Sequence, residues 1–159
     1  MSSKTFQLSD VVHNYLMTQT LRETEVMRRL REETSAMKNA VMQISPEQGQ
    51  FMAMLLQLIG ARNVLEVGTY TGYGTLWMAQ ALPVDGRVVT CDVSERWTFV
   101  AQRFWEMAGM RHKIRLELRP ALETLDALLA AGGESSFDFV FIDADKTNYA
   151  DYFERGLRL

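Results

Sequence analysis

The stretch VLEVGTYTGYG, residues 64–74, constrains the fold more than any other part of this chain. Val64 to Val67 is short and mostly branched, as expected for a strand buried on both faces of a parallel sheet. Three glycines follow within seven residues, and an apolar pattern at helical spacing resumes at Thr75. The stretch predicts a strand, a tight turn and a helix. Glycines in such a turn permit positive φ and the close approach of a ligand, beside a helix N-terminus that favours negative groups.

The spacing of the glycines argues against a dinucleotide site. A dinucleotide-binding turn reads G-x-G-x-x-G, whereas Gly68, Gly72 and Gly74 form G-x-x-x-G-x-G, with Glu66 two positions before the first glycine. A nicotinamide-dependent dehydrogenase is therefore a distant alternative. By itself, a glycine turn after a strand also fits a plain connection to a helix, so the rest of the chain has to decide.

Composition and charge exclude several classes of protein. The length of 159 residues suits one domain with a substantial core, and a net charge of -3 gives no basic footprint for nucleic acid. No apolar run approaches about 18 residues, and the N-terminal residues Met1 to Lys4 lack the apolar core of a signal peptide, so we expect neither a membrane span nor export. The single cysteine, Cys91, cannot form an intrachain disulfide and is expected as a small buried side chain, which fits a cytoplasmic protein.

The remaining pattern alternates between helices and strands. Helices are expected from Ser9 and again over 25–33, where a narrow apolar stripe favours packing against the sheet domain or a partner subunit. Ser45 and Pro46 form a strong helix start, and Gly60 is expected to end that helix. Further strands are expected at 87–92, 114–118 and 137–142, with helices at 95–107, at 121–131 and from 148 onward.

This alternation predicts an α/β fold, a Rossmann-like doubly wound parallel sheet with right-handed crossovers. We expect one domain over residues 1–159, with an N-terminal helical segment at 1–44 and the core at 45–159. Three carboxylates, Glu66, Asp92 and Asp143, then fall at the carboxyl ends of strands, where ligands of such sheets bind. Asp92 lies 24 residues after Gly68, about where an acidic side chain accepts hydrogen bonds from ribose hydroxyls. Together these features favour one ligand crevice over solvated strand ends.

Four segments carry a more specific resemblance. They are MQISPEQGQF at 42–51, EVGTYTGY at 66–73, PALETL at 120–125 and IDADKTNY at 142–149. Together they resemble the caffeoyl-CoA and catechol O-methyltransferase family of cation-dependent, class I S-adenosylmethionine-dependent enzymes, nearly along the whole chain. The resemblance implies methyl transfer to a hydroxyl of a small catechol-like or phenolic acceptor, with a divalent cation, most simply Mg²⁺, and a homodimer.

The resemblance also implies roles for individual residues. It assigns to cofactor binding Ile44, Glu66, Gly68, Thr69, Gly74, Asp92, Ala121 and Asp143. Among these, Glu66, Gly68 and Thr69 would line the methionine end of the cofactor. Asp92 would hold the ribose, and Ala121 would meet the adenine.

The implied catalytic residues are Lys146 and Asp143, and Asp143 is also the implied metal ligand. An all-oxygen Mg²⁺ site would bind both oxygens of a vicinal diol, lower the pKa of one and orient it toward the methyl group. Lys146 matches the candidate general base, provided that burial and the nearby cation lower its pKa toward neutrality.

Three departures from the family pattern matter. Gly74 stands where a small hydroxyl residue is usual, which leaves only the backbone N–H, and Arg119 replaces a glycine before the adenine contact. The family continues with three more strands that complete the metal site, so we expect a C-terminally truncated chain whose strand at 137–142 is an exposed apolar edge. Such a chain would bind divalent cations poorly and methylate catechol slowly. The alternative is a non-catalytic module that binds cofactor or dimerises.

Overall fold

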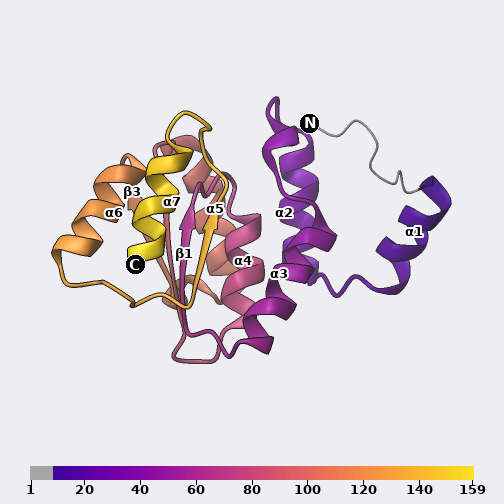
Figure 1. Ribbon diagram of the computed structural model, residues 1–159. Coiled ribbons are helices and arrows are strands. Elements are labelled where there is room, and N and C mark those ends of the chain that lie inside the picture. The colour runs from indigo at the N-terminus through magenta and orange to yellow at the C-terminus, as the bar shows by residue number, and fades with distance from the viewer. Residues whose placement is uncertain (1–8) are drawn as a thin grey trace.

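Four parallel strands form the centre of the computed structural model, which describes residues 9–159 (Figure 1). Their order across the sheet is β3-β2-β1-β4. The strands are β1 (Asn63–Val67), β2 (Arg87–Asp92), β3 (Ile114–Leu118) and β4 (Phe139–Ile142). This confirms the predicted parallel α/β sheet, although β4 begins two residues later than expected. In this register Glu66 of β1 lies beside Thr90 on one side and Phe141 on the other.

Helices cover both faces of the sheet. They are α1 (Asp10–Gln19), α2 (Glu25–Ser35), α3 (Pro46–Leu58), α4 (Tyr73–Ala81), α5 (Glu95–Met107), α6 (Ala121–Ala130) and α7 (Tyr149–Arg158), with short 3-10 turns η1 (Ala40–Met42) and η2 (Arg111–Lys113). Alternate residues of β1 enter two separate cores, because side chains along a strand point to opposite faces. Val64 packs with α2, α3, α4 and α5, whereas Leu65 and Val67 pack with α6 and α7.

The helix α2 uses its narrow apolar stripe within the chain. Met27, Leu30 and Thr34 are 0% exposed, and the helix packs on α4 and α5. The prediction that this stripe meets the sheet domain is therefore confirmed. By contrast, α1 begins at its predicted cap Ser9, lies apart from the sheet in Figure 1 and contains no buried residue.

The start and end of α3 follow the predicted capping signals. The Ser45 hydroxyl accepts the backbone N–H of Gln48 at 3.3 Å, and Pro46 is the first helical residue. Gly60 follows the helix with a φ of +65°, the left-handed conformation that glycine adopts most easily. These residues fix where α3 begins and ends, just before β1.

The strand β4 forms one edge of the described sheet. It is bonded to β1 alone, and each of its four residues is only half-buried. The expectation that this apolar strand lies at an edge is confirmed for residues 9–159. Within the same range, no helix is both long enough and apolar enough to cross a membrane.

Candidate functional site

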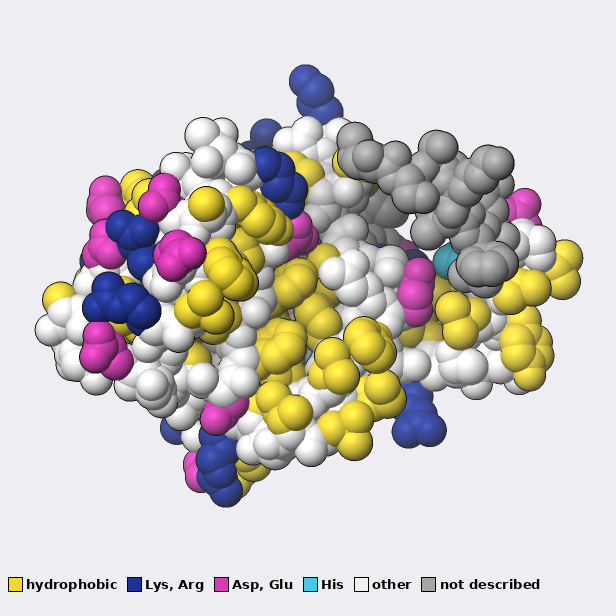
Figure 2. All heavy atoms as spheres, viewed as in Figure 1, with side chains coloured by type: hydrophobic (Ala, Val, Ile, Leu, Met, Phe, Trp, Pro, Cys, Tyr) yellow, Lys and Arg dark blue, Asp and Glu magenta, His cyan; other side chains and the backbone are white. Residues whose placement is uncertain are grey.

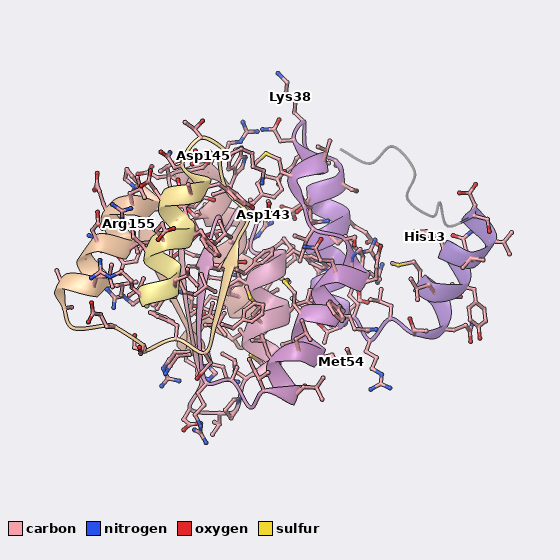
Figure 3. The ribbon with its side chains drawn as sticks, in the orientation of Figure 1. His13, Lys38, Met54, Asp143, Asp145 and Arg155 are labelled. Carbon is pink, nitrogen blue, oxygen red and sulfur yellow. The ribbon has the colours of Figure 1, made fainter. Side chains whose placement is uncertain are left out.

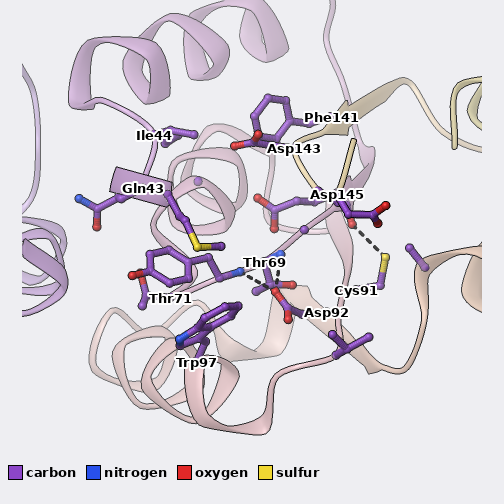
Figure 4. Close-up of a pocket in the computed structure, with 18 of the residues that line it drawn as sticks. Gln43, Ile44, Thr69, Thr71, Cys91, Asp92, Trp97, Phe141, Asp143 and Asp145 are labelled. Carbon is purple, nitrogen blue, oxygen red and sulfur yellow. Dashed lines mark hydrogen bonds between the residues drawn. The ribbon is translucent and has the colours of Figure 1, made fainter. Parts of the chain in front are cut away.

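A cavity of about 470 Å³ opens at the carboxyl ends of the strands (Figure 4). Its volume lies in the range of small-molecule sites. All of the residues predicted from the sequence line it, namely Ile44, Glu66, Gly68, Thr69, Gly74, Asp92, Ala121, Asp143 and Lys146. The structure therefore brings the predicted site together from segments that are far apart in the chain.

The glycine turn is shaped by packing as much as by room for a ligand. A Cβ on Gly68, whose φ is +100°, would lie 2.2 Å from the carbonyl oxygen of Asp143. A Cβ on Gly72, whose φ is +79°, would lie 2.6 Å from the indole nitrogen of Trp105. Both values are far below van der Waals contact, so these glycines let β1 approach β4 and let α4 begin against α5. Close packing therefore requires glycine at both positions, in addition to the ligand approach expected from the sequence.

Asp92 holds the backbone of this turn. Its Oδ2 accepts the N–H groups of Thr69 at 3.1 Å and Tyr70 at 2.8 Å, and its Oδ1 accepts the N–H of Ser94 at 2.9 Å. Figure 4 shows Asp92 beside Thr69 at the cavity. Oδ2 thus already accepts two hydrogen bonds, whereas Oδ1 accepts only one among the described residues and keeps the capacity to bind a ligand hydroxyl.

Glu66 is an almost completely buried carboxyl group, 1% exposed, in the wall of the cavity. Its Oε2 accepts hydrogen bonds from the hydroxyls of Thr75 at 2.5 Å and Thr90 at 2.6 Å. Burial raises the pKa of Glu66 to about 8, although both hydrogen bonds oppose this shift. Charge repulsion from Asp92 and Asp143 adds to the rise.

Lys146 lies at the mouth of the cavity beside Asp143. Its Nζ is 3.6 Å from Oδ1 of Asp143, donates to the Tyr149 hydroxyl at 3.2 Å and sits 4.3 Å from the centre of the Tyr149 ring. The side chain is 73% exposed, and these partners, the tyrosine hydrogen bond first, raise its pKa. Lys146 therefore does not meet, in this structure, the condition of burial and a lowered pKa under which it would act as a general base.

Asp143 and Asp145 both belong to the loop after β4 (Figure 3) but face different partners. Asp145 accepts hydrogen bonds from the Tyr152 hydroxyl at 2.5 Å and from Asn148. Within residues 9–159, no group of three or more acidic, histidine or cysteine side chains is placed to hold a metal ion. Asp143 thus offers a single carboxylate, which the described residues do not extend into a metal site.

Aromatic side chains complete the cavity and were not predicted as site residues. The rings of Tyr70 and Trp97 meet edge to face with centroids 5.1 Å apart, and Tyr152 is 4% exposed. Tyr73 also lines the cavity, and its hydroxyl donates to Glu23 at 2.5 Å. Tyr70 and Tyr73 lie in the glycine turn itself, which was the available signal, whereas Tyr152 enters from α7 only through the tertiary fold.

Arg119, which cast doubt on the adenine contact, turns away from it. Its guanidinium donates to Thr124 at 3.2 Å and pairs with Glu117 at 2.9 Å. Ala121 remains in the cavity lining. The departure at position 119 therefore leaves the predicted contact residue in place.

Comparison with known proteins places these features in a family. The family model described as O-methyltransferase matches residues 17–159. A probable caffeoyl-CoA O-methyltransferase 2 of Dictyostelium discoideum is 38% identical over 96% of this chain and 67% of its own length. Tricin synthase 1 of Oryza sativa subsp. japonica is 42% identical over 99% of this chain and 65% of its own.

Solved structures agree with the sequence comparison. An O-methyltransferase from Bacillus cereus, in complex with SAH, superposes with a TM-score of 0.86 at 36% identity, over 94% of this chain and 67% of that one. TomG from Streptomyces achromogenes, in complex with SAM, gives 0.84 at 31% identity, over 94% and 66%. A mouse relative, catechol O-methyltransferase domain-containing protein 1, is 43% identical over 91% of this chain and 55% of its own. The chain thus spans between 55 and 67% of the length of these relatives.

Proposed function

We infer that this chain, which belongs to the O-methyltransferase family, binds S-adenosylmethionine in the cavity and serves methyl transfer to a hydroxyl of a small phenolic acceptor. The convergence of the predicted cofactor residues on one cavity carries this inference. The bound SAH and SAM of the two solved relatives support it.

The charges of the cavity suit this cofactor. Four acidic side chains and one lysine line it within the described residues, namely Glu66, Asp92, Asp143, Asp145 and Lys146. S-adenosylmethionine carries a sulfonium and an ammonium, which the aspartate carboxylates favour, and a bound cation would in turn favour the ionised form of Glu66 over the protonated form that its raised pKa favours. When bound, the cofactor supplies an electrophilic methyl group.

We assign a part of the cofactor to each of the residues that line the cavity at the carboxyl ends of the strands. Glu66 would receive the methionine end, with the backbone of Gly68 and Thr69 beside it. Asp92 would accept hydrogen bonds from the ribose hydroxyls, and Ala121 would contact the adenine. These groups bind and orient, and holding the reactants at near-attack distance supplies much of the acceleration in such reactions.

Lys146 and Asp143 would meet the acceptor. The ammonium of Lys146, held by Asp143 and Tyr149, can stabilise an acceptor oxygen as it becomes an anion. To act as a general base, Lys146 must first lose a proton, and its raised pKa opposes that loss. In the arrangement of this structure, electrostatic stabilisation is the role that the geometry supports best.

For the divalent cation, we propose Asp143 as one ligand and no complete site. Mg²⁺ needs near-octahedral oxygen coordination and is held by carboxylates together with water or substrate. The described residues give it one carboxylate, whose Oδ1 is already near the Lys146 ammonium. This incomplete donor set favours the alternative function, a module that binds the cofactor without turnover.

A second copy of the chain is the partner that we propose for the N-terminal helix. Val11, Val12 and Tyr15 of α1 are 78%, 49% and 66% exposed. An isolated helix of this length is marginal in water, so we expect it to pack against something. Figure 2 shows further hydrophobic side chains on the same face over α3, where Phe51 and Leu58 are 54% and 73% exposed.

Two measurements on one preparation test the proposed function. Calorimetry with S-adenosylhomocysteine measures binding, and mass spectrometry of catechol with S-adenosylmethionine and Mg²⁺ measures methyl transfer. Binding with turnover that Asp143→Asn abolishes supports the enzyme, with Asp151→Asn on α7 as the exposed matched control. Binding without turnover supports the non-catalytic module, and absence of binding contradicts both.

A further inference from the structure

We propose that Thr90, which does not line the cavity, is a positioning residue for the cofactor and acts through Glu66 and Thr69. The proposal rests on the proposed function, because it concerns how the same cavity is prepared for its ligand. It adds a residue that neither the motif nor the cavity lining identifies.

The position of Thr90 in the sheet explains how it reaches both residues. It lies in the middle of β2, is 0% exposed and stands opposite Glu66 of β1 in the parallel register. Its neighbours along the strand, Val89 and Cys91, are apolar and face the other core. A single hydroxyl is thus placed between two strands, on the face covered by α4.

The hydrogen bonds around this hydroxyl have one consistent direction. Thr90 Oγ1 donates to Glu66 Oε2 at 2.6 Å, and Thr69 Oγ1 lies 2.6 Å from Thr90 Oγ1. A hydroxyl carries one proton, so Thr90 cannot donate to both neighbours. When it donates to Glu66, it accepts from Thr69. The chain of donors therefore runs from the glycine turn, through Thr90, to the buried carboxylate.

A second threonine fixes the same oxygen from the opposite side. Thr75 of α4 is 0% exposed and donates to Glu66 Oε2 at 2.5 Å. Both clamping donors therefore act on Oε2, which sets the rotation of the carboxyl group. The other oxygen, Oε1, lies 3.0 Å from the position of a Cβ on Gly74, a residue of the cavity wall. The clamp directs Oε1 toward the side from which the cofactor would approach.

Loss of the Thr90 hydroxyl should affect ligand binding more than packing. Valine has nearly the shape of threonine, so Thr90→Val keeps the volume of the core while it removes one donor from the buried carboxyl group of Glu66. It also leaves Thr69 without its side-chain partner. Serine keeps the donor and loses only a methyl group, so Thr90→Ser separates the hydroxyl from the packing.

Calorimetric titration with S-adenosylhomocysteine tests the proposal on the full chain. We expect Thr90→Val to weaken binding about tenfold, the scale of one lost hydrogen bond, and Thr90→Ser to stay within about threefold of the unsubstituted chain. Thr98→Val is the matched control, because Thr98 is buried and its hydroxyl bonds, among residues 9–159, only to the carbonyls of Ser94 and Glu95. It should leave the affinity unchanged.

The outcomes separate this proposal from the proposed function. If Thr90→Val binds as tightly as the unsubstituted chain, or if Thr90→Ser is as weak as the valine variant, the positioning role is overturned. If the unsubstituted chain does not bind the ligand, the proposed function fails and takes this inference with it. Should Thr90→Val not fold, Thr75→Val removes the other donor on the same oxygen and is expected to weaken binding in the same direction.

Discussion

Asp92 accepts the backbone N–H of Tyr70 at 2.8 Å and thereby holds a residue whose φ is +49°. A non-glycine residue in this left-handed region is strained by about 1–3 kcal/mol and persists only where its surroundings fix it. Asp92 thus stabilises the turn in addition to the ribose contact that we propose for it.

This double role predicts two separable effects of Asp92→Ala. We expect affinity for S-adenosylhomocysteine to fall by roughly 1–3 kcal/mol, because a hydrogen bond to a charged group is lost. We also expect a lower melting temperature. Unchanged affinity in Asp92→Ala would remove Asp92 from the site.

The buried Glu66 predicts a pH-dependent stability. Its pKa is about 8 in the folded chain against an ordinary value of 4.5, so between these values the unfolded chain binds fewer protons. The free energy of unfolding should therefore fall as pH rises through this window, by up to about 1 kcal/mol per pH unit. Urea unfolding of the unsubstituted chain and of Glu66→Gln checks this contribution. The two pH profiles should diverge, and parallel profiles would contradict it.

Two glycines with positive φ offer a matched pair of variants. A Cβ at Gly68 would lie 2.2 Å from the Asp143 carbonyl, whereas a Cβ at Gly60 meets nothing within 4 Å. We expect Gly60→Ala to lower the free energy of unfolding by about 1 kcal/mol, from backbone strain alone. Gly68→Ala should lower it by more than roughly 2 kcal/mol, because strands must also move apart. Equal losses would show that the approach of β1 to β4 is not tight.

The exposed apolar side chains of α1 predict self-association. We expect light scattering to find a dimer, and Tyr15→Glu to shift it toward monomer by placing a charge in the interface. Gln19→Glu, on the same helix at another exposed position, should leave the mass unchanged. A monomer at high concentration of the unsubstituted chain would count against this partner.

The elements of the fold were predictable because their signals are local. The β2 and β3 strands and the cap at Ser45 follow from branched runs and capping residues, and the structure has them at the predicted residues. The start of β4 was set two residues too early, because Phe137 continues the apolar run without joining the ladder.

The candidate site was predictable as a set of residues but not as a set of contacts. Parallel strands bring their carboxyl ends together, so Glu66, Asp92 and Asp143 could be grouped from the pattern alone. The hydrogen bond from Thr90 to Glu66 depends on the register between β1 and β2, which the sequence did not define. Likewise, the exposure of Lys146 and its contact with Tyr149 arise from how the loop after β4 enters α7.

Calorimetric titration with S-adenosylhomocysteine shows whether the cavity at the strand ends is a site for S-adenosylmethionine. We predict saturable binding of one molecule per chain, with the same affinity in the presence of a chelator, since the described residues hold no complete metal site. We also predict that NAD⁺ gives no binding heat under the same conditions. No binding of S-adenosylhomocysteine, or equally tight binding of NAD⁺, would contradict the assignment of this cavity to S-adenosylmethionine.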